Sequence, residues 1–408
     1  MILQDKRILL GVTGGIAAYK AADLASKLVQ AGAQVDVILT AAATAFVAPL
    51  TFESLTHRAV HTDVLAMAAA GEKREIAHIS LAKAADLFIV APATAQTLAK
   101  LALGLADDLL GATALSCPAP LLIAPAMESH MWEHPATQAH VRTLRERGAT
   151  FVGPATGRLA SGALGVGRMA EPSDILEMAR TMLGRRGPLG GRCVVITAGG
   201  TVEPLDPVRV LTNRSSGKMG VALAQAARDA GAAVILIHAP LAVSVPAGVE
   251  TIAVRTAVEM CDAVFSVLGN ADVLIGAAAV ADFRPAEAAA QKLKKGAAEE
   301  LLVRLVRNPD ILAKVAAYRQ EHDRPRVIVG FAAETEDLLK NAQAKMAAKK
   351  LDMVVANDVS EAGSGFGADD NRVILLYKDG KQEMLPLLPK VEVAERIIAK
   401  ISEMLNKV

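Results

Sequence analysis

Two adjacent glycines near the amino end stand where a phosphate group could bind. In "GVTGGIAAYK" (residues 11–20), Gly14 and Gly15 lie between an expected strand and an expected helix. The unpaired N–H groups and the dipole at a helix N-terminus attract phosphate. The spacing lacks the G-x-G-x-x-G pattern, and the next strand ends in Thr40 instead of an acid that would hold a ribose. The segment favours a mononucleotide such as FMN over NAD, with a tight turn that binds nothing as the alternative.

Two later features add chemistry to the same expected sheet. The segments "APATAQT" (91–97), with Ala93 and Thr94, and "PAMESHMW" (125–132) follow apolar runs and bring hydroxyls and backbone amides to the carboxyl edge, where a planar cofactor could lie. His78 titrates near neutral pH and could act as an acid or base. Because its neighbours are apolar, a hydrogen-bonded core histidine is the alternative.

A glycine-rich segment, "GRLASGALGVGRMAEP" (157–172), interrupts the regular patterns. Its glycines predict neither a helix nor a central strand, and we expect a long mobile loop. Loops of this length are usually flaps or linkers. Ser161, in the middle of the segment, is a candidate for chemistry if the loop is a flap.

In the second half of the chain, "NRSSGKMG" (213–220) looks like a phosphate-binding loop but departs from that motif. Thr212 stands where the motif needs glycine, and Met219 stands where it needs serine or threonine. The segment closes a polar insertion that also contains Arg209 and Asn213. Such an insertion could hold a polyanion at a helix start, and a solvated loop is the alternative.

A basic run further on could bind a triphosphate with its metal ion. "QKLKKG" (291–296) follows an expected strand end that contains Asp282, and a turn, "NPDIL" (308–312), comes next. Lys345 and Lys349 are four residues apart and share one face of an expected helix. The alternative for these lysines is an ordinary solvated surface.

Alternating strand and helix patterns must position these residues. "RILLGV" (7–12) predicts a buried strand, a helix follows up to Gly32, and "AQVDVILT" predicts the next parallel strand. The same logic restarts at "GRCVVITAGG" (191–200). We therefore predict two doubly wound, Rossmann-like α/β domains with mainly parallel sheets, residues 1–190 and 191–408, joined by an exposed linker at 183–191. Ligands of such sheets bind beyond the carboxyl ends of the strands.

The composition agrees with two globular domains and excludes several classes of protein. The chain has 408 residues, 52% of them hydrophobic, and a formal net charge of +1. This balance argues against nucleic acid or an anionic membrane as the main partner. Three distant cysteines, Cys117, Cys193 and Cys261, fit no disulfide or metal pattern, and no apolar run is long enough to span a bilayer. We expect a cytoplasmic protein.

Taken together, the segments resemble the bifunctional phosphopantothenoylcysteine decarboxylase/phosphopantothenate–cysteine ligases of bacterial coenzyme A biosynthesis. The matching motifs occur in family order over nearly the whole chain: "GGIAAYK", "APATA", "PAMxxxMW", "GxGRM", "PLDPVRxxxNxSSGKMG", "AAVADF", "KxKK", "NPDI", "GFAAET" and "ANDV". The resemblance implies a flavodoxin-like flavoprotein domain at 1–190 and a nucleotide-binding ligase domain at 191–408. It implies small-molecule substrates: 4′-phosphopantothenate, cysteine and CTP.

For the C-terminal domain, the resemblance implies that CTP with Mg²⁺ activates 4′-phosphopantothenate as an acyl-cytidylate, from which the amine of cysteine displaces CMP. Arg209 and Asn213 would handle the acyl-cytidylate, Lys292 would act in catalysis, and Asp282 would also hold the metal ion. The residues implied to hold CTP are Gly276, Ala277, Ala278, Asp282, Lys292, Pro309, Asp310, Ile311, Leu312, Phe331, Lys345 and Lys349.

For the N-terminal domain, the resemblance implies that FMN oxidises the cysteinyl CH₂–SH group to a thioaldehyde, an electron sink for the loss of CO₂. The resulting enethiol would then be reduced to 4′-phosphopantetheine. His78 matches the catalytic histidine of the family. The residues implied to bind FMN are Gly14, Gly15, Thr40, Ala93 and Thr94, and those implied to bind substrate are Met127, Arg168 and Met169.

Two residues depart from the family pattern. Glu128 stands where asparagine is common, and an ionised glutamate would repel the substrate carboxylate, whereas a protonated one, if burial raises its pKa, could donate a hydrogen bond. Ser161 stands where some members carry a cysteine as proton donor, and a hydroxyl is a much weaker acid than a thiol. The alternatives are therefore an active ligase with an impaired decarboxylase, and a flavoprotein scaffold or regulatory module. The resemblance also implies trimeric flavin domains and dimeric ligase domains, hence a dodecamer.

Overall fold

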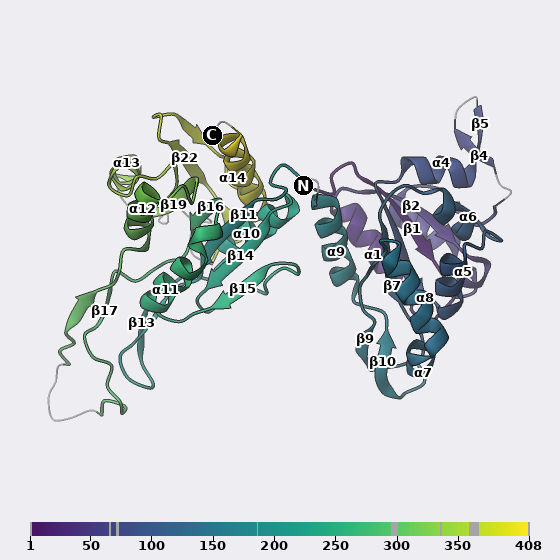
Figure 1. The fold of residues 1–408 in the computed structure, drawn as a ribbon, viewed down its shortest axis with the longest axis horizontal. Helices are drawn as coiled ribbons and strands as arrows, with labels where there is room; N and C mark the ends of the chain where they lie inside the picture. Colours follow the sequence, from purple (N-terminus) through teal and green to yellow (C-terminus); the bar gives the residue numbers. More distant parts are fainter. Residues whose placement is uncertain are drawn as a thin grey trace. The chain divides into compact units, whose positions relative to one another are not determined.

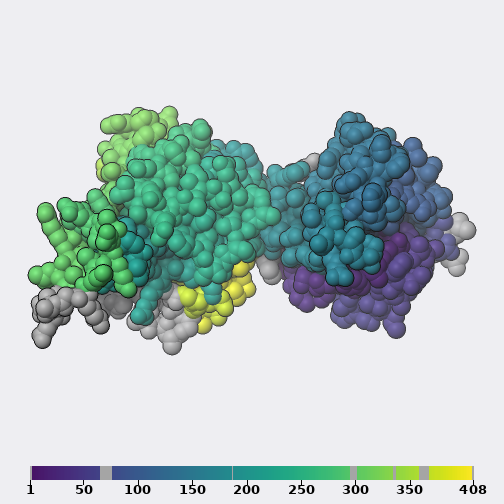
Figure 2. Space-filling model, turned by 90° about the horizontal axis from the view of Figure 1, so that it is seen from below, coloured from purple at the N-terminus to yellow at the C-terminus, as the bar shows by residue number. Residues whose placement is uncertain are grey.

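The computed structural model describes residues 2–64, 67–70, 73–185, 187–294, 301–334, 337–358 and 367–406. The chain divides into two compact units, residues 1–183 and 184–408, and Figure 2 shows the residues of each unit packed into a continuous mass. Both units are α/β, so the predicted fold class is confirmed. Of the helices in the described ranges, none combines the length and the apolar character needed to cross a membrane.

The first unit is built on a parallel six-stranded sheet. Its strand order is β3-β2-β1-β6-β7-β8, which reverses direction between β1 and β6. Ligands of open parallel sheets bind at such a reversal, beyond the carboxyl ends of the strands. The strands are β1 (Arg7–Val12), β2 (Gln34–Leu39), β3 (Val60–His61), β6 (Leu87–Ala93), β7 (Leu121–Pro125) and β8 (Thr150–Phe151).

Helices cover both faces of this sheet, and the apolar strands therefore bury both of their faces (Figure 1). One face packs against α1 (Ala18–Gln30), α3 (Pro49–Thr56) and α9 (Pro172–Gly184). The other packs against α4 (Ala77–Ala84), α5 (Ala95–Leu103), α6 (Leu109–Ser116) and α8 (Pro135–Glu146). The unit also contains α2 (Ala41–Thr44), α7 (Ser129–Glu133) and the ribbon β4 (Met67–Ala70)–β5 (Lys73–Ile76).

The second unit repeats this plan and extends it. Its sheet has the order β15-β14-β11-β16-β19-β20-β22-β23, parallel up to β20 and antiparallel at β22 and β23. The order reverses between β11 and β16, as it does between β1 and β6. The strands are β11 (Cys193–Ala198), β14 (Ala233–His238), β15 (Glu250–Ala253), β16 (Val273–Gly276), β19 (Val327–Glu334), β20 (Met353–Asp358), β22 (Val373–Tyr377) and β23 (Gln382–Met384).

Two helices cover one face of the second sheet, α10 (Lys218–Asp229) and α14 (Lys390–Leu405). The other face packs against α11 (Ala257–Val267), α12 (Ile311–Glu321) and α13 (Leu338–Ala348), with the short helix η1 (Leu268–Asn270) after α11. The strands β21 (Asp370–Asn371) and β24 (Leu388–Pro389) pair beside α14.

Two antiparallel ribbons extend from the second unit, away from its sheet (Figure 1). They are β12 (Val202–Pro204) with β13 (Val210–Thr212), and β17 (Phe283–Pro285) with β18 (Leu305–Arg307). The first ribbon lies within the polar insertion, so that segment is more ordered than the solvated loop considered from the sequence.

The segment between the units is not exposed throughout, because it contains a buried leucine. The sequence predicted an exposed linker at 183–191, but Leu189 has no exposed surface and packs in the core of the second unit. Its N–H group donates to the carbonyl of Ala230 at 2.8 Å. This part of the segment therefore belongs to the second unit. Burial of the Leu189 side chain, worth about 1.5–3 kcal/mol, favours this ordered position.

Aspartates tie neighbouring strands together at the amino ends of both sheets. Asp86, just before β6, accepts the N–H of Arg7 in β1 at 2.9 Å. Asp272, just before β16, accepts the N–H of Cys193 in β11 at 2.9 Å. Asp352, just before β20, accepts the N–H of Ile328 in β19 at 2.8 Å. Each carboxylate fixes the register of an adjacent pair of strands.

Candidate active sites

In the first unit, the residues implied to bind FMN meet at the strand reversal. Thr13, which follows β1, donates through Oγ1 to the carbonyl of Pro92 in β6 at 2.7 Å and accepts from the N–H of Thr94 at 3.3 Å. This buried hydroxyl joins the two loops at the strand reversal. Sequence reasoning missed Thr13, although its place directly before Gly14 was a signal.

The loops after β2 and β6 lead directly into helix N-termini. Thr40 caps α2 by accepting the N–H of Ala43, and Thr94 caps α5 by accepting that of Thr97, both at 3.3 Å. The remaining first-turn N–H groups have no partner within their helix. Ala93 ends β6, has no exposed surface and accepts the N–H of Ala126 at its carbonyl at 2.9 Å, so the structure leaves no part of this residue open to a cofactor.

The two glycines after β1 play different parts. A Cβ atom on Gly14 would lie 2.3 Å from the Cβ of Ala42, so the turn needs glycine there. A Cβ atom on Gly15 would find its nearest neighbour, Cγ2 of Thr94, at 3.8 Å. The turn is therefore closed at Gly14 and roomy at Gly15, which fits a phosphate that approaches the backbone closely.

His78 lies in the first turn of α4 and is partly exposed. Its Nδ1 atom is buried and has no hydrogen-bond partner among the described residues. Its neighbours Ile76 and Ile79 are 48% and 36% exposed. A hydrogen-bonded core histidine, the alternative from the sequence, does not describe this site.

The glycine-rich segment is a two-stranded hairpin and is therefore more regular than the loop expected from the sequence. β9 (Ala155–Arg158) pairs antiparallel with β10 (Leu164–Arg168), and Ser161 is exposed in the turn between them. Gly167 accepts the N–H of Met127 at 2.9 Å, and a Cβ atom on Gly167 would lie 2.1 Å from the carbonyl oxygen of Met127. Glycine thus lets the ribbon pair closely with the segment that follows β7.

The base of this hairpin is held by charges. Glu171 accepts from Lys20 of α1 at 2.9 Å and from Arg168 at 2.6 Å. The hydrogen bond from Lys20 lowers the pKa of Glu171, and the charge of Arg168 adds to the effect. Met169 is only 1% exposed and packs in the core, so its predicted direct contact with substrate was wrong.

Glu128 caps α7 and is not the protonated donor considered from the sequence. Its carboxylate accepts the N–H of His130 at 2.7 Å and lies 3.0 Å from Nδ1 of the same residue. Loss of water around the carboxylate would raise its pKa, but the hydrogen bonds from His130 outweigh that, and the pKa lies below its usual value. At 39% exposure, the side chain is an ionised helix cap.

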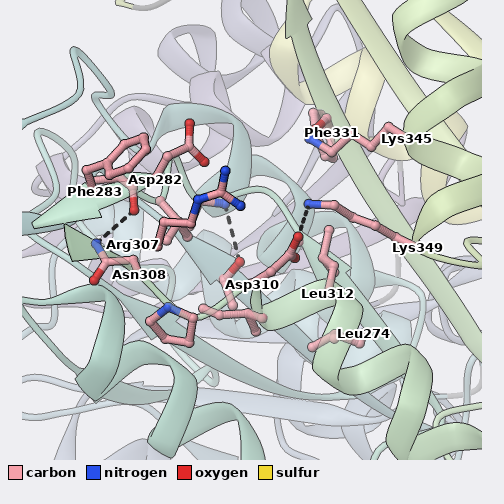
Figure 3. Close-up of a pocket in the computed structure, with 17 residues that line it drawn as sticks. Leu274, Asp282, Phe283, Arg307, Asn308, Asp310, Leu312, Phe331, Lys345 and Lys349 are labelled. Carbon is pink, nitrogen blue, oxygen red and sulfur yellow. Dashed lines mark hydrogen bonds and ion pairs between the residues drawn. The ribbon is translucent and has the colours of Figure 1, made fainter.

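In the second unit, a cavity of about 410 Å³ lies at the carboxyl ends of β16 and β19 (Figure 3). Most residues implied to hold CTP line it: Gly276, Ala278, Asp282, Pro309, Asp310, Ile311, Leu312, Phe331, Lys345 and Lys349. Ala277 and Lys292 do not line it. Segments far apart in the sequence therefore converge on one site, as the resemblance implied.

Charged groups are held in place around this cavity. Nζ of Lys349 lies 2.9 Å from the carboxylate of Asp310, which also caps α12, and Figure 3 shows the lysine reaching across to it. Lys345 donates to the carbonyl of Phe331 at 2.6 Å. Asn308 donates through its side chain to the carbonyl of Ala281 at 2.8 Å. These contacts fix the cations on one wall of the cavity.

Sequence reasoning also missed cavity residues. Arg307 lines it just before the turn 308–312, and Asn308, the first residue of that turn, also lines it but was not among the residues implied to hold CTP. Thr197 of β11 accepts the N–H of Ala278 at 3.3 Å and so joins the two strands at the reversal, as Thr13 does in the first unit. Their adjacency to recognised motifs was the available signal.

The three residues implied to act in catalysis of the ligase lie outside the cavity lining. Asn213 is exposed and donates to the carbonyl of Ala279, whose neighbours Ala278 and Val280 line the cavity. Arg209 pairs with Asp206 at 2.7 Å. Lys292 is exposed, and the last two residues of the basic run, 295–296, lie outside the described residues.

The described residues bring together no cluster of three histidine, cysteine or acidic side chains that would hold a metal ion. Asp282 is an exposed carboxylate at the cavity. Mg²⁺ is commonly bound by one or two carboxylates together with substrate phosphates, and the donor set here fits that mode.

Comparison with known proteins gives matches along the whole chain. Residues 2–184 match a family model described as flavoprotein, and residues 189–405 match one described as the DNA/pantothenate metabolism flavoprotein C-terminal domain. The coenzyme A biosynthesis bifunctional protein CoaBC of Bacillus subtilis (strain 168) is 46% identical over 404 residues, 98% of each chain. That of Mycobacterium tuberculosis (strain ATCC 25618 / H37Rv) is 46% identical over 407 residues, 97% of this chain and 96% of that protein.

A solved structure of the C-terminal domain of a CoaBC protein is 38% identical, covers 53% of this chain and 97% of that one, and has a TM-score of 0.45. The full-length relatives and the two family models agree on both halves of the sequence. The chain belongs to the CoaBC family of bifunctional coenzyme A biosynthesis proteins.

Proposed function

We propose that the chain performs two consecutive steps of coenzyme A biosynthesis. The C-terminal domain (191–408) condenses 4′-phosphopantothenate with cysteine at the expense of CTP. The N-terminal domain (1–190) then decarboxylates the product oxidatively and reduces it to 4′-phosphopantetheine. The observation that carries the proposal is the cavity of the second unit, where residues implied to hold CTP converge from four separate segments.

In the ligase step, the cavity would hold the triphosphate with its charges opposed by cations. Lys345 and Lys349 stand on one wall, and Asp282 would share Mg²⁺ with the phosphates. Bound Mg²⁺ supplies neutralisation of phosphate charge. A carboxylate oxygen of phosphopantothenate attacks the α-phosphorus and pyrophosphate leaves. The amine of cysteine then attacks the acyl carbon, loses a proton, and CMP leaves with the C–O bond electrons.

Asn213 and Arg209 would act on the acyl-cytidylate. Asn213 lies over the strand reversal, where its amide already donates to the backbone next to the cavity. Hydrogen-bond donors placed where negative charge develops stabilise acyl-transfer transition states. These roles rest on the family motif together with the placement beside the cavity.

In the decarboxylase step, the loops at the strand reversal of the first unit would hold FMN. Gly14, Gly15, Thr40 and Thr94 would receive its phosphate and ring through backbone and hydroxyl groups, and the orphaned Nδ1 of His78 is a polar atom that a ligand could satisfy. Bound FMN supplies a two-electron acceptor and donor. His78 would move a proton at the cysteinyl group, Arg168 would contact the substrate, and the β9–β10 hairpin would exclude water.

One incubation tests the proposal. The purified protein is supplied with 4′-phosphopantothenate, cysteine, CTP and Mg²⁺, and the products are identified by mass. We expect CMP, pyrophosphate, CO₂ and 4′-phosphopantetheine. Accumulation of phosphopantothenoylcysteine, or of a product two hydrogens lighter than phosphopantetheine, would instead favour the impaired decarboxylase. Absence of CMP would contradict the ligase, and flavin binding without turnover would leave a scaffold or regulatory role.

We also propose that the protein works in the cytoplasm as a homo-oligomer of trimeric flavin domains and dimeric ligase domains. Exposed apolar side chains support association: Val208, Val210, Leu211, Phe283 and Leu305 on the ribbons of the second unit, and Ile16, Tyr19, Phe46 and Leu50 on the first unit. Light scattering on the intact protein and on a Phe283→Asp variant tests the assembly, and a monomeric wild-type protein would contradict it.

A further inference from the structure

The carboxylate of Asp206 is the most heavily bonded side chain in the described part of the ribbon turn between β12 and β13. It has no exposed surface. Oδ1 accepts the N–H groups of Val208 and Arg209, both at 2.8 Å. Oδ2 accepts hydrogen bonds from Nε and Nη2 of Arg209 at 3.0 and 2.7 Å, and from the N–H of Leu293 at 3.1 Å. Both oxygens are thus engaged.

These bonds join two segments that are far apart in the sequence. Leu293 belongs to the stretch 289–294, here called the strap, which also carries Lys292. Arg209 donates a further bond from Nη2 to the carbonyl of Leu293 at 2.9 Å. Ala289 donates to the carbonyl of Leu205 at 3.0 Å. The strap and the turn are therefore fastened to each other at both ends of the strap.

We propose that Asp206 is a positioning residue of the ligase: it holds the guanidinium of Arg209 and the strap bearing Lys292 in fixed mutual positions beside the cavity. The inference rests on the proposed function, since Arg209 and Lys292 take their roles from it. Neither side chain lines the cavity, so their approach to a substrate depends on how the turn and the strap are held. Asp206 is the group that contacts both.

The chemistry of the site requires an ionised carboxylate. Loss of water would raise the pKa of Asp206, but the hydrogen bonds from Arg209 and from the N–H groups of Val208 and Leu293 outweigh it, and the pKa lies far below its usual range. Asparagine has the same shape but only one acceptor oxygen. Its NH₂ group would face N–H donors on one side, and either the turn or the Arg209–Leu293 side would lose its bonds.

The test compares D206N with D272N in the full-length protein. Asp272 is also buried and accepts a backbone N–H and arginine side chains, but it lies at the amino end of the sheet. We expect D206N to slow CMP release by about 10- to 100-fold, the loss typical of hydrogen bonds to a charged group. D272N should lower the melting temperature but keep its rate within about twofold. Decarboxylation of supplied phosphopantothenoylcysteine should be unchanged in both.

Two further readouts separate positioning from simple stability. If Asp206 acts through Arg209, the D206N/R209Q double variant should be nearly as fast as R209Q alone, because the effects of coupled residues are not additive. Hydrogen exchange at the amide of Leu293 should rise in D206N and stay at the wild-type level in D272N. Equal rates for D206N and D272N, multiplying losses in the double variant, or unchanged exchange at Leu293 would overturn the proposal. A wild-type protein that releases no CMP contradicts the proposed function, while the exchange measurement still tests the anchor.

Discussion

The two units of the chain share one plan but equip it differently. Each has a mainly parallel sheet whose strand order reverses beside its first strand, and each joins the two strands at the reversal through a threonine, Thr13 or Thr197. The loops at the reversal of the first unit offer backbone N–H groups and hydroxyls. Those of the second unit border a cavity lined by Lys345, Lys349 and acidic side chains.

This difference teaches what each ligand demands of the same scaffold. A single phosphate can be held by neutral N–H groups at helix starts, and such a site stays compatible with a flavin ring lying on apolar strand ends. A triphosphate carries several charges, which helix N-termini alone do not neutralise, and under the proposed function the lysines and Asp282 at the cavity of the second unit would meet that demand. The strands set the place, and the loops after them set the chemistry.

The largest expected effect separates the two chemistries. His78→Asn should lower CO₂ release by at least about 100-fold, since a proton-transferring side chain commonly contributes 10²- to 10⁴-fold. CMP release should stay at the wild-type rate, because His78 belongs to the first unit only. Both rates are measured in the same incubation, and a parallel loss of CMP release would show that the units are not chemically separable.

The converse change removes a cation from the cavity of the second unit. Lys349→Gln should raise the KM for CTP by about 10- to 100-fold, since hydrogen bonds to charged groups are worth about 1.5–3 kcal/mol. Lys340→Gln is the matched control, because Lys340 is exposed on α13, the helix that Lys349 directly follows, and does not line the cavity. Equal KM values for the two variants would remove Lys349 from the CTP site, and decarboxylation should respond to neither.

A smaller effect is expected at Glu128, where the sequence departs from the family pattern. Glu128→Asn should raise kcat/KM for phosphopantothenoylcysteine by about three- to tenfold, because an amide replaces an ionised carboxylate near the substrate carboxylate, and rim charges act through a high dielectric. Asparagine is a good N-cap, so the melting temperature should change little. A slower variant would show that the Glu128–His130 pair takes part in the reaction of this chain.

At the tip of the hairpin we expect a change in product ratio more than in rate. Ser161→Cys should raise the fraction of saturated product over the enethiol by about twofold, since a thiol is several pKa units more acidic than a hydroxyl. Ser161→Ala is the control and should resemble the wild type. Mass analysis of the products distinguishes the two, and identical ratios in all three proteins would place the proton donor elsewhere.

The smallest effect concerns the ion pairs at the base of the hairpin. Because Lys20 lowers the pKa of Glu171 in the folded state, the pair contributes stability above the ordinary glutamate pKa, and the contribution is lost as the pH falls. Glu171→Gln should lower the melting temperature by about 2 °C at pH 7, as a half-exposed pair is worth under about 1 kcal/mol. Calorimetry should show the difference vanishing below about pH 4, and a constant difference would mean that packing is responsible.

The fold class and family could be predicted because their signals are local. Apolar strands, helix periods and glycine turns recur in both halves, and ordered motifs extend over the whole chain. The convergence of Lys349 and Asp310 on one cavity also followed from their motifs. The antiparallel strands β22 and β23 were missed, although the apolar run of β22 and the Asp379-Gly380 turn after it were a hairpin signal.

The remaining features depend on contacts between distant segments. The glycines of 157–172 suggested a loop, but β9 pairs with β10 to form a ribbon, and Gly167 of that ribbon accepts a hydrogen bond from Met127. Met169 lies inside a family motif, yet packing, which no motif encodes, puts it in the core. The bond between Asp206 and Leu293 spans 87 positions, and nothing near either residue announces it.

The aspartates at the amino ends of the strands have a consequence for protein engineering. Asp86, Asp272 and Asp352 lock strand register at the edge opposite the ligand sites. A loop transplanted to the carboxyl edge would therefore join strands whose register is already fixed, and the pairing of those strands should not change. In this chain the strands and their aspartates must stay constant, whereas the loops at the carboxyl edge can be exchanged to create new specificity.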